Sequence, residues 1–183
     1  MLIYPRFAAL ILTALSLGLS FAHVLEMPAK LAYPPDVYVT LQNSLYVSFG
    51  PPNVGAFVEP GAILAVVSLA YLVRRRRRAL WLTVGSAVCL LLAFPVVFFI
   101  FTEPANSFFR AARLTPLPAD FEAYRSQWEY SQAARFVLHA AGFGLLALSV
   151  LIRPRAAHSE LSPFTGGAIP TERARSYSSP SPY

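Results

Sequence analysis

The sequence predicts an all-α membrane protein, a bundle of four transmembrane helices with short amphipathic external helices and a disordered C-terminal tail. The 183-residue chain is 56% hydrophobic and only 13% charged, about half the charged fraction that is usual for a soluble domain. No charged residue occurs in 61–73 or in 79–102. Uncharged apolar runs of this kind are typical of segments that cross a bilayer.

The first predicted span covers about residues 5–27. Between Phe7 and Leu25, His23 is the only ionisable side chain. The start of the chain also resembles a secretory signal peptide, with Ser20-Phe21-Ala22 as a cleavage site. The apolar run is longer than the core of a usual signal peptide, and cleavage would leave His23 at a free end. We therefore favour an uncleaved span.

The second predicted span covers about residues 54–73 and follows an external segment, 28–53. That segment contains a short amphipathic helix, for which Asp36 is the expected N-cap. A span that began at Pro60 would be about 21 Å long, shorter than the hydrocarbon layer of about 30 Å. An earlier start places Glu59 inside the span, about two turns deep.

The third predicted span covers about residues 79–102, with a kink at Pro95. A second external segment, 107–131, contains a helix for which Asp120 is the expected cap. The fourth span covers about residues 132–152, and an alternative is that it continues directly from that external helix.

Basic residues predict the orientation of the bundle. Five arginines, Arg74–Arg78, separate two spans, and their simplest role is a cytoplasmic anchor, with binding of anionic lipid headgroups as the alternative. The other basic residues on that side are Arg6, Arg153 and Arg155, whereas the opposite side has Lys30, Arg110, Arg113 and Arg125. We expect a multi-pass protein of the cell (inner) membrane with both termini cytoplasmic, and a disordered cytoplasmic tail over residues 153–183.

Several function classes lack their signals in the sequence. The net charge of +6 is largely the arginine block, with no groove-reading element beside it, so we expect no nucleic-acid partner. One cysteine, Cys89, forms no intramolecular disulfide. No zinc-finger spacing, glycine-rich phosphate loop or nucleophile elbow occurs.

Every predicted span carries polar side chains toward its external end. Ionisable groups at membrane depth are costly and usually functional, and a helical bundle can bring them to one level. Trp128, Gln132, Arg135 and His139 also form one stripe on the fourth helix. The predicted catalytic residues are His23, Glu59, Arg135 and His139. The predicted ligands of a divalent metal ion, if one is bound, are His23, Glu26, Glu59, Glu103 and His139. The predicted substrate-binding residues are Asn106 and Trp128.

A structural plug is the alternative interpretation of the same side chains. Arg135 can neutralise Glu59 or Glu103, and His23 can pair with Glu26. The protein would then be a non-enzymatic membrane protein, whose polar cluster holds the bundle together or binds a partner. A proton or metal-ion conduit is a weaker third hypothesis, because the cytoplasmic half of the second and third spans offers no polar relay.

The chain resembles the anthrone oxygenase-like family of four-span integral membrane proteins, largely a domain of unknown function. The resemblance rests on His23-Val24-Leu25-Glu26-Met27-Pro28, on Phe101-Thr102-Glu103-Pro104-Ala105-Asn106, and on the Trp128 region followed by an apolar helix. It implies an oxidoreductase that oxidises a lipophilic, polycyclic aromatic substrate with oxygen, without a conventional flavin or haem. It also implies that His23, Glu59, Asn106 and His139 deprotonate or position an enolisable substrate that enters from the lipid bilayer.

Overall fold

The computed structural model of the chain describes residues 2–49, 53–112, 114 and 116–152. These residues are almost entirely helical and include no strand. Four helical segments are long and apolar enough to cross a membrane: α1 (Ile3–Ala32), α3 (Gly55–Leu72), the continuous segment Arg77–Ala111, and α6 (Phe121–Leu151). The predicted all-α, four-helix membrane fold is confirmed. The predicted tail, 153–183, lies outside the described residues.

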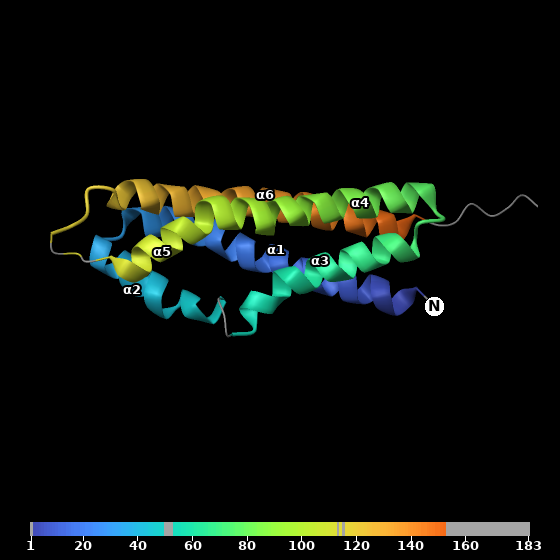
Figure 1. The fold of residues 1–183 in the computed structure, drawn as a ribbon, viewed down its shortest axis with the longest axis horizontal. Helices are drawn as coiled ribbons and strands as arrows, with labels where there is room; N and C mark the ends of the chain where they lie inside the picture. Colours follow the sequence, from blue (N-terminus) through green and yellow to red (C-terminus); the bar gives the residue numbers. More distant parts are fainter. Residues whose placement is uncertain (1, 50–52, 113, 115, 153–183) are drawn as a thin grey trace, which may run out of the picture. The chain divides into compact units, whose positions relative to one another are not determined.

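The four long helices run alternately up and down within one compact unit, Met1–Arg153 (Figure 1). The start of α1, the α3–α4 turn and the end of α6 lie together. We call this the arginine end, because it carries Arg6 and Arg74–Arg78. The opposite end holds the α1–α2 and α5–α6 connections, and we call it the α2 end.

The third long segment consists of three helices in direct succession. It comprises α4 (Arg77–Leu91), the π-helix η2 (Leu92–Thr102) and α5 (Glu103–Ala111). The sequence predicted a simple kink at Pro95 and an end near residue 102. Instead, a proline without a backbone N–H lies inside a stretch of wider helix, and the helix then continues to Ala111. Wider turns of this kind are frequent at functional sites.

Two further predictions need correction at the α2 end. Helix α1 continues through Pro28 to Ala32, so Lys30 belongs to the helix and not to an external loop. Helix α2 (Pro35–Ser44) has Pro34 at its N-cap, so the prediction that Asp36 caps it is wrong. The 3-10 helix η1 (Tyr46–Phe49) follows α2.

The α6 helix is unbroken over Phe121–Leu151, as in the alternative that joined the external helix to the fourth span. Asp120 occupies the predicted N-cap position, although its side chain makes no capping hydrogen bond. The consequence for the site is that residues near the start of α6 and residues deep in the bundle lie on one rigid element.

Small apolar side chains form the core of the arginine-end half. The buried cluster consists of Ala9, Ala62, Val66, Leu69, Val73, Ala79, Ala87, Leu90 and Leu146. A Cβ atom added at Gly142 would lie 3.2 Å from Cys89 Cβ and 3.4 Å from the Ser86 carbonyl oxygen. Helices α4 and α6 therefore approach closely there, as small residues allow in membrane bundles.

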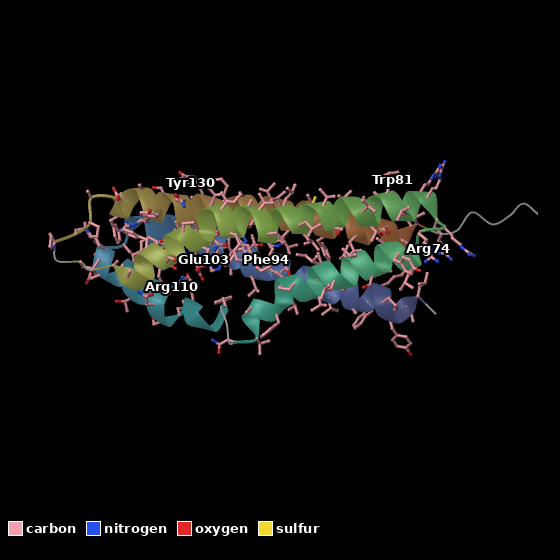
Figure 2. The ribbon with its side chains drawn as sticks, in the orientation of Figure 1. Arg74, Trp81, Phe94, Glu103, Arg110 and Tyr130 are labelled. Carbon is pink, nitrogen blue, oxygen red and sulfur yellow. The ribbon has the colours of Figure 1, made fainter. Side chains whose placement is uncertain are left out.

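A separate aromatic core lies at the α2 end. It contains Tyr38, Ala105, Phe109, Phe121 and Trp128, all nearly inaccessible to solvent. These residues pack α2 against α5 and α6. Large apolar side chains such as Trp81 and Tyr130 project from the outside of the bundle (Figure 2), as expected for a surface in contact with lipid.

Candidate functional site

A pocket of about 640 Å³ lies in the α2-end half of the bundle. Every long helix contributes to its wall, together with α2 and η1. The lining residues are Leu19, Ser20, His23, Gln42, Asn43, Tyr46, Phe49, Gly55, Ala56, Glu59, Phe94, Phe98, Phe99, Glu103, Asn106, Phe109, Arg110, Trp128, Gln132 and Arg135. Six of the eight predicted site residues are among them; Glu26 and His139 are not.

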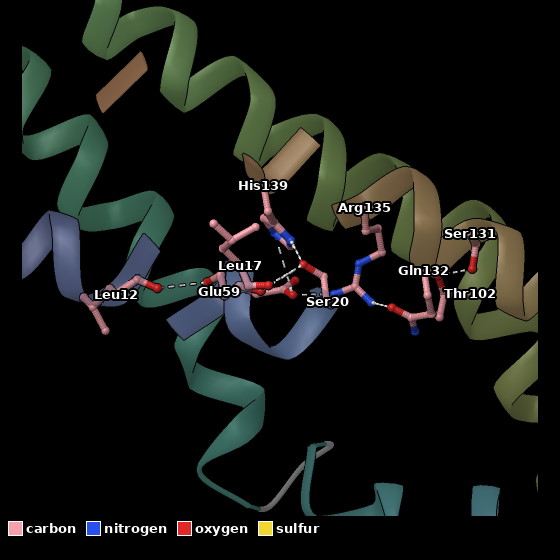
Figure 3. A network of polar contacts seen from close by, with 10 residues as sticks. Leu12, Leu17, Ser20, Glu59, Thr102, Ser131, Gln132, Arg135 and His139 are labelled. Atoms are coloured by element: carbon pink, nitrogen blue, oxygen red, sulfur yellow. Dashed lines mark hydrogen bonds and ion pairs between the residues drawn. The ribbon is translucent and has the colours of Figure 1, made fainter. Parts of the chain in front are cut away.

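The inner part of the pocket is formed by an ion pair between Glu59 of α3 and Arg135 of α6 (Figure 3). Arg135 Nη2 donates a hydrogen bond to Glu59 Oε1, and Arg135 Nη1 donates to Gln132 Oε1 at 2.9 Å. The guanidinium also lies 5.1 Å from the centre of the Phe98 ring. Both charged side chains are about nine-tenths buried, so each depends on the other for neutralisation.

Glu59 and Arg135 each retain a buried polar atom with no hydrogen-bond partner among the described residues. These atoms are Glu59 Oε2 and Arg135 Nε. A buried polar atom without a partner is uncommon in a native structure and often marks a site that contacts water or a ligand. The pair therefore keeps one acceptor and one donor whose hydrogen-bonding capacity is unused among the described residues.

His139 lies close to Glu59 and does not line the pocket. Its Nδ1 lies 3.1 Å from Ser20 Oγ, and its Nε2 lies 3.8 Å from Glu59 Oε1. The side chain is only 1% exposed. His139 is therefore close to the Glu59 carboxylate without hydrogen-bonding to it, and its predicted catalytic role stays a prediction.

His23 stands in the pocket wall among aromatic rings. Its imidazole packs edge-on against Tyr46 and Trp128, with ring centres 4.9 and 5.1 Å away, and obliquely against Phe49. His23 Nδ1 lies 3.7 Å from Glu26 Oε2 and has no hydrogen-bond partner within the described part of the chain. The predicted pairing of His23 with Glu26 is thus present as a close contact, although Glu26 lies outside the pocket lining.

Tyr38 of α2 and Tyr46 of η1 bring these two short helices into the polar network. The Tyr46 hydroxyl donates a hydrogen bond to Glu26 Oε2, and the Tyr38 hydroxyl donates to Glu129 Oε1 at 3.0 Å. Burial raises the pKa of both phenols above the ordinary value, and the nearby carboxylates raise it further. Both tyrosines are therefore firmly protonated hydrogen-bond donors.

A second ion pair forms the outer rim of the pocket on α5. Arg110 Nη2 lies 2.5 Å from Glu103 Oε1, and Asn106 Nδ2 donates to Glu103 Oε2 at 3.0 Å. The Trp128 indole N–H in turn donates to Asn106 Oδ1 at 2.7 Å. Asn106 and Trp128, predicted to bind a substrate, are thus hydrogen-bonded to each other in the pocket wall.

A buried ion pair between Lys30 and Glu129 was missed by the sequence analysis. Lys30 Nζ lies 3.0 Å from Glu129 Oε1 and 3.9 Å from the centre of the Trp128 ring. Both residues are at most 2% exposed. Pro28 suggested that the helix ended before Lys30, and Glu129 lies beside the Trp128 stripe, where side chains of α1 and α2 both contact it. The available signal was the position of Lys30 four residues after Glu26, which places the two side chains on one helix face.

The five predicted metal ligands do not form a common metal site. The described part of the chain contains no group of three or more His, Cys, Asp or Glu side chains arranged to hold a metal ion. Glu59 and Glu103 are engaged by arginines, and Glu26 by Tyr46 and by Lys30 at 4.0 Å. Each of these three carboxylates thus already has a cationic partner, and the five predicted ligands are not gathered as a divalent ion requires.

The pocket lining is balanced in charge. It contains two carboxylates, Glu59 and Glu103, and two guanidinium groups, Arg135 and Arg110. Each carboxylate is paired with one of the two arginines. A free anion or cation would have to compete with an existing ion pair, whereas a neutral molecule with hydrogen-bonding groups would not.

Comparison of the chain with family models, with curated proteins and with solved structures gives no match. The resemblance to the anthrone oxygenase-like family therefore stays a prediction. What can be said of function comes from the pocket itself.

Proposed function

We propose that this integral membrane protein binds a neutral, flat aromatic molecule in its pocket and takes that molecule from the lipid phase. The observation that carries the proposal is the combination of aromatic walls with a buried, charge-balanced Glu59–Arg135 pair. In the proposed orientation the arginine end and both termini are cytoplasmic, in the cell (inner) membrane, because basic residues concentrate there. The pocket then lies toward the external face.

The walls favour an aromatic ligand. Rings of Tyr46, Phe94, Phe98 and Trp128 line the pocket, and aromatic side chains attract planar rings through offset-stacked or edge-to-face contacts. A volume of about 640 Å³ lies within the range of small-molecule sites, roughly 300–1,000 Å³. A molecule of two or three fused rings with a carbonyl or hydroxyl group is of suitable size.

The inner ion pair favours a polar group at one edge of that ligand. Arg135 Nε supplies a donor and Glu59 Oε2 an acceptor, both buried and without partners among the described residues. A ligand carbonyl or hydroxyl placed there would satisfy an otherwise costly buried polar atom. Because the pair is already neutral, a ligand without net charge adds no uncompensated charge in the membrane.

Access from the bilayer is supported by the wall between α3 and η2. Phe99 lines the pocket and is also 55% exposed on the outside of the bundle. Opposite, α3 contributes Gly55 and Ala56, which have little or no side chain. On the other side η2 is fixed to α6, where Thr102 Oγ1 and Ser131 Oγ lie 2.8 Å apart. A lipophilic molecule can thus reach the pocket without first entering water.

Tryptophan fluorescence tests the proposal, because the chain has two tryptophans in different places. Trp128 is 2% exposed in the pocket wall, whereas Trp81 is 70% exposed on α4. In nanodiscs, 1,4-naphthoquinone should quench Trp128 saturably in a Trp81→Phe variant. In a Trp128→Phe variant, the remaining Trp81 should report only linear, collisional quenching from the lipid. Equal, non-saturating quenching of both tryptophans would contradict the proposal.

An oxygenase is the second candidate function, and His23 is the observation that favours it. This imidazole lines the pocket beside the Glu26 carboxylate, and no described residue hydrogen-bonds to its Nδ1. It can accept a proton from an activated methylene of an anthrone-like ligand. Dioxygen is the oxidant: the methylene loses two hydrogens and gains one oxygen atom, and the second oxygen atom leaves as water.

Oxygen consumption with anthrone separates the two candidates. If the protein is an oxygenase, wild-type protein consumes oxygen with anthrone, and His23→Gln abolishes turnover while saturable quenching by naphthoquinone remains. If oxygen uptake is no faster than in empty nanodiscs while Trp128 still reports saturable binding, the oxygenase is excluded and the binding function stands.

A further inference from the structure

A second cavity, distinct from the pocket, lies at the arginine end of the bundle. It is a groove of about 500 Å³ between the start of α1, the α3–α4 turn and the end of α6. Its apolar lining includes Leu2, Phe7, Leu10 and Val150, and its polar lining consists of Arg6 and Arg76. The groove therefore combines a hydrocarbon surface with two guanidinium groups.

The cations of this end have no carboxylate partners in the described residues. The chain has nine acidic residues, of which Glu160 and Glu172 lie outside the described part. The other seven belong to the α2-end half: Glu26, Asp36, Glu59, Glu103, Asp120, Glu122 and Glu129. None of the ion pairs among the described residues involves Arg6 or Arg74–Arg78.

The arginines of the α3–α4 turn are not equivalent. Arg74 donates a hydrogen bond to the Tyr71 carbonyl oxygen at 3.0 Å and lies 4.0 Å from the centre of the Tyr71 ring. Figure 2 shows Arg74 at the arginine end, far along the bundle from Glu103 and Arg110. Arg76 is the one member of the block that lines the groove, where it shares the lining with Arg6 of α1.

We propose that this groove binds an anionic phospholipid. The phosphate lies between Arg6 and Arg76, and one acyl chain lies along Leu2, Phe7 and Leu10. Guanidinium groups bind phosphate oxygens through strong, charge-assisted hydrogen bonds. Basic pockets between membrane helices are suited to anionic headgroups, and an adjoining apolar surface selects a lipid over free phosphate. Binding at this site would join α1 to the α3–α4 turn.

Native mass spectrometry after reconstitution with phosphatidylglycerol and phosphatidylcholine tests this site. The variant is Arg6→Gln/Arg76→Gln, and the matched control is Arg75→Gln/Arg78→Gln, which removes the same charge from exposed residues outside the groove. Wild type and control should retain one phosphatidylglycerol. The groove variant should bind it roughly thirtyfold more weakly, since each basic side chain near an anionic surface contributes about a fivefold factor.

A thermal-shift measurement in detergent distinguishes a lipid from a free anion. Phosphatidylglycerol should raise the melting temperature of the wild type and the control but not of the groove variant. Glycerol phosphate, which has the headgroup charge without acyl chains, should raise none of them. Equal loss of lipid in both double variants would show diffuse attraction by the whole arginine block and overturn the site. The site would also be overturned if the groove variant retained phosphatidylglycerol, or if glycerol phosphate raised the melting temperature as much as phosphatidylglycerol does.

Discussion

The two halves of the bundle place their polar side chains in opposite ways. In the arginine-end half, buried hydroxyls bond to their own helix or to one neighbour, as Thr13 does to the Ala9 carbonyl oxygen and Thr83 to Ser149. In the α2-end half, charged side chains from different helices are buried together, as in the Lys30–Glu129 and Glu59–Arg135 pairs. Buried charges add little net stability even when paired. The comparison teaches that buried polar groups serve helix packing in the arginine-end half, whereas in the α2-end half they join charged groups of several helices around the pocket.

Removing one member of the inner ion pair should have the largest effect on stability. Arg135→Met leaves the Glu59 carboxylate buried without its main partner, and we expect the free energy of unfolding to fall by about 3–5 kcal/mol. Unfolding in mixed detergent micelles measures this. The double variant Glu59→Leu/Arg135→Met should recover most of the loss, because no charge is then left unpaired. A loss below about 1 kcal/mol for Arg135→Met would show that water reaches the site and that the half is not a desolvated pocket.

A change in the packing half should alter stability but leave binding intact. Gly142→Ala introduces a Cβ atom 3.2 Å from Cys89 Cβ, so the helices must separate slightly, at a cost of about 1–3 kcal/mol. Gly144 is the matched control, because a Cβ atom there meets nothing within 4 Å, and Gly144→Ala should be neutral or stabilising by up to about 1 kcal/mol. Quenching of Trp128 by naphthoquinone should saturate at the same concentration in both. A weaker affinity for naphthoquinone in Gly142→Ala would show that packing at the arginine end and binding at the pocket are not independent.

Alkaline pH should produce the most gradual effect, confined to pH values above about 10, and it should come from the α2 end. The folded state raises the pKa of Tyr38 and Tyr46, so the folded protein keeps protons that the unfolded chain releases above about pH 10. Stability should therefore be flat below about pH 9 and fall above pH 10 by up to about 1.4 kcal/mol per pH unit for each tyrosine. Tyr38→Phe/Tyr46→Phe should flatten this slope, while also lowering stability at every pH through two lost hydrogen bonds. An unchanged slope in the double variant would show that the two phenols are not the groups responsible.

Much of the membrane architecture follows from periodicity and composition. The four spans and the position of Glu59 inside the second of them were accessible from the sequence. An apolar run that contains a charge requires an opposite charge at the same depth, which limited the partner of Arg135 to Glu59 or Glu103, and the structure selects Glu59. The structure places His23, Asn106 and Trp128 in one pocket wall for a similar reason, since each lies toward the α2 end of the bundle.

Features that depend on tertiary contacts were not accessible. Pro28 indicates a helix end, but α1 continues to Ala32 because one missing backbone hydrogen bond is tolerated within a packed helix. Lys30 and Glu129 are buried where side chains of α1, α2 and α6 meet, and a side-chain stripe on α6 alone does not reveal that contact. The π-helix η2 likewise arises from how the chain accommodates Pro95 between α4 and α5, for which the sequence has no separate signal.

Filling the pocket from its lipid side tests the central claim most directly. Ala56→Phe adds a ring to the pocket lining, whereas Val67→Phe adds one to a lipid-exposed position on the same helix. In the Trp81→Phe background, the claim predicts that Ala56→Phe abolishes saturable quenching of Trp128 by naphthoquinone and that Val67→Phe leaves it unchanged. Saturable quenching that persists with the same affinity in Ala56→Phe would contradict the claim that this pocket is the binding site.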